Sequence, residues 1–290
     1  MVVRLVLSRK GFDARYGGMA SPILPDGTLL PLPIPHAGEQ TTLLQCLPPL
    51  GGIDPEALLH DLSRGRLDGR RPVHADPQLT PPPGAPPGWR ASLGQAGAAA
   101  SHLCRRGVGR GDLFLFFGWF RQVCRRAGRW SYAPGAPDEH RIFGWLEVGE
   151  VLRPGSADVP WPPGQGWLAQ HPHLRRDDLR ADRANTLYLA SRWSRLVPGA
   201  AGGGRFDRAA PAQRLTAAEA PGRSLWSLPG WFLPPSGVPS LTYHTDPALW
   251  QRRGDRVLLH SARIGQEFVL PLPEGPEPRR WLAALIGGGH

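Results

Sequence analysis

The sequence predicts an α+β protein in which a mixed β-sheet, or a small barrel, is flanked by a few helices. Apolar runs rich in β-branched and aromatic residues, which favour strands, alternate with segments that carry helix-capping signals. Glycine (37) and proline (34) make up about a quarter of the 290 residues, which predicts long irregular loops. No unit of 20–50 residues recurs, so a repeat architecture is excluded.

The first segment predicts a strand followed by tight turns. Residues 2–7 are apolar and β-branched around one arginine, so we expect an opening strand that ends close to Lys10. The Asp26-Gly27 pair is typical of a hairpin turn. Alternate prolines in residues 31–35 cannot donate hydrogen bonds to a β-ladder, so this piece is expected to lie extended along a surface or sheet edge.

Two helices are expected before residue 107. Asp54 is a suitable N-cap in front of Pro55 and Glu56, and the apolar residues that follow end at Gly65. A second, alanine-rich helix is expected over residues 94–106, with arginines in its last turn.

The remaining elements are mostly strands. Residues 112–120 are too short and too aromatic for a free helix and predict a buried strand, with residues 141–151 as its sheet partner. Shorter strands are expected at 185–190, 241–244, 256–260 and 267–270, and a closing helix at 279–286. We expect a single domain over residues 1–290, which could divide near residues 152–170.

Composition favours a polyanionic partner. The formal charge of +10 suits a nucleic acid or a nucleotide, because arginine matches the geometry of phosphate; a basic surface that serves only solubility is the alternative. The three cysteines form no CxxC pair, and no apolar run reaches the length of a signal peptide or membrane span. We therefore expect a cytoplasmic protein with no membrane partner; the oligomeric state is left open.

Lys10 is the only lysine among 34 basic residues. Unlike arginine, lysine carries a compact ammonium that can coordinate phosphate, transfer a proton or form a Schiff base. Its neighbours Arg9 and Asp13 could add a second cation and an acid–base group. The alternative is compositional drift from lysine to arginine, with Lys10 surviving by chance.

Two histidine motifs suggest acid–base or metal chemistry. In His74-Ala75-Asp76 an imidazole and a carboxylate share one side of an extended segment, although Asp76 could instead build a turn. His171 and His173 flank a proline, and with His74 or Asp76 they could form a two-His-one-carboxylate site. Because no HExxH motif is present, no residue is assigned to a metal, and any cofactor is left unknown.

The arginine- and aromatic-rich residues 105–130 could bind an opened or single-stranded nucleic acid. Trp119 and Phe120 are the expected stacking residues, since the earlier phenylalanines suit a sheet core. Gln95 and Gln266 carry amides of the kind that read base edges, although capping or loop hydrogen bonds would also explain them. The chain has no Walker A, GxGxxG or GxSxG motif, which excludes the commonest nucleotide-hydrolysing, dinucleotide-binding and serine-hydrolase classes.

Several strings resemble a known family. Residues 8–13 (SRKGFD) and 111–120 (GDLFLFFGWF) are specific matches. Further matches occur at residues 17–18, 21–27, 33–35, 74–77, 94–95, 143–144, 171–173, 185–186 and 265–268, of which 171–173 and 265–268 would be weak alone. Together they resemble the third type of nucleotide modification associated domain. The resemblance implies a role in bacterial and phage systems that modify nucleobases, and it supplies no catalytic residues. Residues 111–117 and 143–151 also look similar to strands of PUA-like barrels, including modified-base readers.

The sequence therefore predicts an enzyme that acts on a base in nucleic acid or on a nucleotide. Lys10, Asp13, His74 and Asp76 are the expected catalytic residues. The expected substrate-binding residues are Arg9, Gln95, Trp119, Phe120, His171, His173 and Gln266. A non-catalytic, PUA-like reader of modified bases is the first alternative, and a His/Asp metal-dependent hydrolase is the second.

Overall fold

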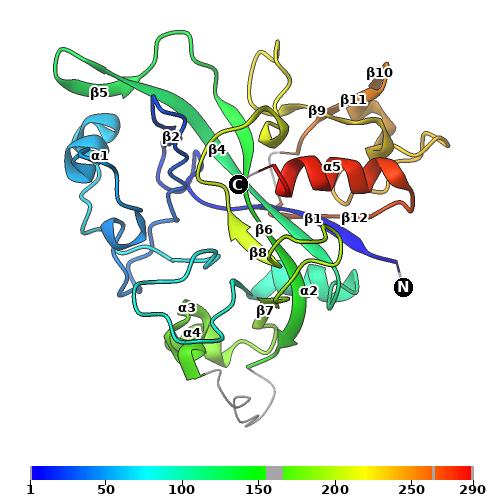
Figure 1. Cartoon of the computed structure of the whole chain (residues 1–290), viewed down its shortest axis with the longest axis horizontal. Helices are drawn as coiled ribbons and strands as arrows, with labels where there is room; N and C mark the ends of the chain where they lie inside the picture. The colour runs from blue at the N-terminus through cyan, green and yellow to red at the C-terminus, as the bar shows by residue number, and fades with distance from the viewer. Residues whose placement is uncertain (1, 155–165, 263–264, 289–290) are drawn as a thin grey trace.

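A computed structural model describes residues 2–154, 166–262 and 265–288. A mixed sheet of nine strands dominates this part of the chain, in the order β12-β1-β4-β6-β7-β3, with β2 and β5 pairing with β4 and β8 pairing with β6 (Figure 1). A separate sheet has the order β10-β11-β9. The α+β prediction is confirmed in its mixed-sheet form. Residues 155–165, which include most of the place where the domain could divide, lie outside the described residues.

The strands and helices have the following bounds. The strands are β1 (Arg4–Arg9), β2 (Ser21–Ile23), β3 (Ser92–Gln95), β4 (Leu113–Arg126), β5 (Arg129–Tyr132), β6 (Glu139–Leu152), β7 (Thr186–Ala190), β8 (Gly203–Arg205), β9 (Leu225–Pro229), β10 (Trp250–Arg253), β11 (Arg256–His260) and β12 (Glu267–Pro271). The α-helices are α1 (Pro55–Ser63), α2 (Gly97–Arg105), α3 (Pro172–Arg175), α4 (Asp177–Ala181) and α5 (Pro276–Ile286). Short 3-10 helices cover Leu44–Cys46, Gly166–Gln170, Pro211–Gln213, Gly230–Phe232 and Pro247–Leu249. No helix among the described residues combines the length and apolar character that crossing a membrane requires.

The long antiparallel pair β4 and β6 organises the large sheet. Apolar side chains of β4 are buried on both faces of the sheet, which explains the continuous hydrophobic run in its sequence. A register shift between Phe116 and Phe117 leaves Phe143 of β6 without a partner in β4, and all three rings are buried. Strand β1, the first strand of the chain, runs parallel to β4 and antiparallel to β12. It therefore connects β12, the last strand, to β4 at the centre of the sheet.

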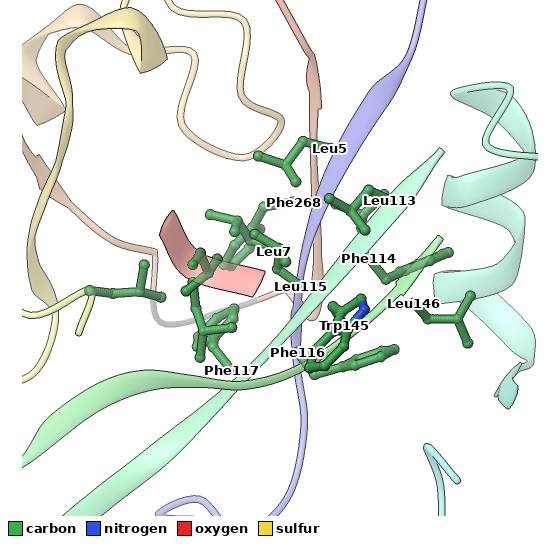
Figure 2. Close-up of a cluster of buried hydrophobic side chains, with 14 of the residues drawn as sticks. Leu5, Leu7, Leu113, Phe114, Leu115, Phe116, Phe117, Trp145, Leu146 and Phe268 are labelled. Atoms are coloured by element: carbon green, nitrogen blue, oxygen red, sulfur yellow. The ribbon is translucent and has the colours of Figure 1, made fainter. Parts of the chain in front are cut away.

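Aromatic packing connects the two sheets. The ring of Phe117 lies 5.1 Å from that of Trp226 in β9 and 6.1 Å from that of Phe268 in β12, and all three are fully buried. Figure 2 shows Leu5 and Leu7 of β1 packed beside Phe268 and the β4 side chains in the same core. A second core, beneath α1, gathers Phe12, Leu30, Leu58 and other residues.

Most expected elements are confirmed, with small differences in their ends. The Asp54 side chain accepts a hydrogen bond from the Glu56 amide at the start of α1, as its capping role requires. The strands expected at 112–120, 141–151, 185–190, 256–260 and 267–270 correspond to β4, β6, β7, β11 and β12, and the closing helix to α5.

Two expectations were wrong. The helix expected from residue 94 begins at Gly97, because Gly94 and Gln95 pair with β7 as the end of β3. Residues 241–244 form a turn and no strand, since Tyr243 has a left-handed backbone (φ 65°) that interrupts an extended segment.

We expect Phe117→Ala to lower the free energy of unfolding by about 3–5 kcal/mol, because the cavity would open at the junction of the two sheets. Urea denaturation measures this change. Val238→Ala is the control, since Val238 is 66% exposed and its truncation should alter stability by less than about 0.5 kcal/mol. Equal effects of the two substitutions would contradict this description of the core.

Candidate functional site

The site begins where β1 ends beside β12. Ser8 lies opposite Glu267 in the antiparallel register, so their side chains share one face of the sheet. Lys10 follows on the same face and places its ammonium Nζ 3.1 Å from Oε1 of Glu267. The Lys10 side chain is only 10% exposed, so the one lysine of the chain points into the protein.

Glu267 is a fully buried carboxylate with three donors to one oxygen. Its Oε1 accepts hydrogen bonds from Ser8 Oγ (3.0 Å), Lys10 Nζ (3.1 Å) and Gln95 Nε2 (2.6 Å). Among the described residues, its Oε2 has no hydrogen-bond partner. Burial raises the pKa of Glu267, and the charge and hydrogen bond of Lys10 oppose that rise.

Asp76 is the second buried carboxylate. The pairing of Gln78 with Ser92 brings its segment alongside β3, where the Gly94 amide donates to Asp76 Oδ1 at 2.8 Å. The same oxygen lies 3.4 Å from Nε2 of His171. Burial alone would raise the pKa of Asp76, but the neighbouring histidines, His171 first among them, hold it well below its ordinary value.

Two imidazoles face each other beside Asp76. Nε2 of His74 lies 3.3 Å from Nε2 of His173. Nδ1 of His74 contacts Glu39 Oε1 at 2.6 Å, and Nδ1 of His173 contacts Asn185 Oδ1 at 2.8 Å. Burial lowers the pKa of His173 to about 4, so this ring is neutral at neutral pH.

These contacts form one continuous cluster. Gln95 touches Glu267, and the residue before it, Gly94, touches Asp76. The Asp76 charge also contributes to the raised pKa of Glu267, which places the two carboxylates within electrostatic reach. We call the set the polar cluster: Ser8, Lys10, Glu39, His74, Asp76, Gln95, His171, His173, Asn185 and Glu267.

Comparison with known families gives the cluster a context. The family model for nucleotide modification associated domain 3 matches residues 4–271 of the 290 and so spans every residue of the polar cluster. The chain belongs to this family. The description of the family associates the protein with nucleotide modification. No curated protein and no solved structure matches the chain significantly.

Five residues expected at the site of this nucleotide modification associated domain lie outside the polar cluster: Arg9, Asp13, Trp119, Phe120 and Gln266. Arg9 points to the opposite face of β1, where its guanidinium lies over the rings of Phe117 and Phe268. The Asp13 carboxylate accepts hydrogen bonds from the amides of Arg15 and Tyr16 and shapes a turn.

Gln266 is exposed, because the strand alternation that buries Glu267 turns its neighbour outward. Phe120 is fully buried, so the expectation that its ring stacks on a base does not fit its position. Trp119 is half-buried, donates to Asp138 and has the Arg223 guanidinium 4.1 Å from its ring centroid.

Sequence reasoning missed four members of the polar cluster: Ser8, Glu39, Asn185 and Glu267. Glu267 had a usable signal, because a carboxylate at the start of an apolar run has to find a partner when the run is buried. Glu39 lies in a loop and had no comparable signal.

A cavity of about 440 Å³ lies beside Glu39, a size within the range of small-ligand sites. Its lining includes Gln40, Gln170, Arg175 and Arg176. Arg176 is paired with both Glu39 and Asp178, so its charge is largely compensated within the domain.

We expect Gly94→Ala to disrupt the cluster, because a Cβ at this position would overlap the imidazole ring of His173. The buried ring and β3 would have to separate, at a cost of about 1–3 kcal/mol in the free energy of unfolding. Thermal denaturation measures the loss. Gly109→Ala is the matched control, since a Cβ there meets nothing within 4 Å; a stable Gly94→Ala protein would show that the close contact is dispensable.

Proposed function

We propose that this protein is an enzyme that modifies a nucleobase, either in a nucleotide or in nucleic acid, at the polar cluster. The observation that carries the proposal is a series of contacts: Lys10 and Gln95 contact Glu267, Gly94 beside Gln95 contacts Asp76, and Asp76 contacts His171. Buried ionisable groups are costly to maintain, so their concentration in one place favours a catalytic use.

The histidine half of the cluster suits proton transfer. His173 is held neutral by burial, and a neutral imidazole can accept a proton. The Glu39 carboxylate contacts Nδ1 of His74, an arrangement that orients the ring and directs its Nε2 toward His173. His74 and His173 are therefore the proposed acid–base pair, with Asp76 as the charge that stabilises them.

The lysine half suits charge stabilisation. Lys10 is engaged by Glu267, so an anionic substrate would compete with that carboxylate for the ammonium. A group that carries developing negative charge can win this competition in a buried setting, because the ion pair is already desolvated. We assign Lys10 and Gln95 to substrate charge and orientation, and Glu267 to holding both in place.

The alternative of a non-catalytic base reader has less support. A reader of this kind needs an open aromatic face for stacking. Phe120 offers none, and Arg223 already lies over the ring of Trp119. The acid–base groups of the polar cluster would also have no task in a protein that only binds.

We expect Lys10→Gln to weaken nucleotide binding roughly tenfold, because a charge-assisted contact to the bound base would be lost. Fluorescence anisotropy with labelled deoxynucleotides and short oligonucleotides measures the affinity. Arg129→Gln removes one exposed positive charge outside the cluster and should change it little. Equal losses in both variants would mean that overall charge alone attracts the ligand.

We expect wild-type protein, expressed in a bacterial host, to yield a nucleoside of altered mass in the host's digested DNA, RNA or nucleotide pool. His74→Ala should abolish the altered nucleoside because it removes half of the acid–base pair, yet leave nucleotide affinity within about threefold. Liquid chromatography with mass spectrometry detects the product. An unchanged amount of product in His74→Ala would remove this histidine from the reaction, and a wild type that binds but changes no nucleoside would favour the reader.

A further inference from the structure

The Nε2 atoms of His74 and His173 face each other, and a neighbouring side chain contacts the other ring nitrogen of each histidine. Asn185 Nδ2 donates to the carbonyl oxygen of His173, which fixes the amide so that its Oδ1 faces the imidazole. Because that oxygen can only accept, the ring proton of neutral His173 lies on Nδ1. The Glu39 carboxylate fixes the proton of His74 on Nδ1 in the same way. When both rings are neutral, they present unprotonated lone pairs to each other across 3.3 Å.

Two lone pairs at this distance repel unless a positive charge lies between them. We propose that His74, His173 and Asp76 bind one divalent transition-metal ion of the Zn²⁺ class. The three donor atoms, Nε2, Nε2 and a carboxylate oxygen, lie within 4.8 Å of one another. The proposal rests on the proposed function for its place in the polar cluster and revises the role of the two histidines: with an ion bound, their Nε2 atoms would be ligands, and proton transfer would pass to water on the ion. Metal binding can be tested without any nucleotide.

The spacing of the imidazoles matches a zinc site. Zn–N bonds of about 2.0–2.1 Å at tetrahedral angles place two nitrogens roughly 3.3 Å apart. The observed separation of the two Nε2 atoms is 3.3 Å. The spread of up to 4.8 Å across the set is wider than in an occupied tetrahedron, so binding would draw the Asp76 carboxylate toward the two nitrogens.

Each proposed ligand has a partner that orients it, as metal ligands in proteins usually do. Glu39 contacts the distal nitrogen of His74, and Asn185 that of His173. For Asp76 the partners are the Gly94 amide and His171. Nδ1 of His171 accepts from the His173 amide, and its Nε2 is a buried atom that faces Asp76 without completing a hydrogen bond.

The charge around the site also favours a cation. Three buried carboxylates, those of Glu39, Asp76 and Glu267, are accompanied by the cations of Lys10 and Arg176, and Arg176 is shared with Asp178, so the formal charge is negative with neutral histidines. A divalent ion would offset this negative charge. With three protein ligands it would keep a position for water or substrate, where it would lower the pKa of bound water or polarise a base carbonyl.

The test is a metal titration of the full-length protein after treatment with a chelator. Isothermal titration with Zn²⁺ should give one ion per chain, and Co²⁺ should give visible d–d bands typical of a four- or five-coordinate N/O site. Bound Zn²⁺ should also raise Tm by several degrees. A folded protein that binds no ion in either titration overturns the proposal and leaves a shared proton between the imidazoles.

Variants locate the ion. Asp76→Asn should weaken Zn²⁺ binding by roughly 100-fold or more, and Glu39→Gln by roughly 10–100-fold because it acts only through His74. His60→Ala is the control, since the His60 side chain is 70% exposed and lies outside the cluster. Equal losses in Asp76→Asn and His60→Ala would overturn the assignment. Should Asp76→Asn fail to fold, a wild-type-like Co²⁺ spectrum in Glu39→Gln together with unchanged affinity would overturn it as well.

Because no nucleotide is present in these titrations, they separate this proposal from the proposed function. Stoichiometric metal binding without any nucleoside product would support the metal site and contradict the proposed enzymatic function. Product formed by chelator-treated protein would support the enzymatic function and contradict a role for the metal.

Discussion

The buried carboxylate of Glu267 is the constraint on which the arrangement of the site depends. An ionised carboxylate without water has to be compensated by donors, and this one draws them from three places in the chain: Ser8, Lys10 and Gln95. Ser8 lies in β1, Lys10 follows β1, Gln95 ends β3, and Glu267 opens β12. In the strand order of the sheet, β12 and β1 lie at one end and β3 at the other. Satisfying a single charge therefore brings the first strand, the last strand and the β3 edge together at one point.

Close approach of backbone to side chain is the second requirement. At Gly94 the strand has no Cβ, and the imidazole of His173 occupies the space that a Cβ would take. The same residue donates its amide to Asp76, so one glycine allows the histidine to enter and fixes the carboxylate that faces it. Its neighbour Gln95 points to Glu267 and joins the two halves of the cluster. The helix expected at this position would have broken the arrangement, because the β3–β7 pairing holds both residues extended.

Local chemistry in the sequence selected six residues of the polar cluster but could not predict that they lie together. Lys10, His74, Asp76, Gln95, His171 and His173 were selected for what their side chains can do, and all six lie in the polar cluster. Their partners are far away in the chain: 257 positions separate Lys10 from Glu267, and 99 separate His74 from His173. No periodicity or cap encodes such pairings. Arg9 was expected beside Lys10 in the site but lies outside the polar cluster, because strand alternation places its side chain on the opposite face of β1.

The overall charge of the chain and the charge of the polar cluster have opposite signs. This difference determines which part of a substrate each would attract. The chain carries a formal +10, which attracts polyanions over long range, whereas Glu39, Asp76 and Glu267 outnumber Lys10 and Arg176 in and beside the polar cluster. A phosphate drawn to the surface would thus be repelled from the cluster itself, while a neutral heterocycle would not. This division favours phosphate contacts outside the cluster with only the base inside it, and a bound divalent cation would add the positive charge that a base acquiring electron density requires.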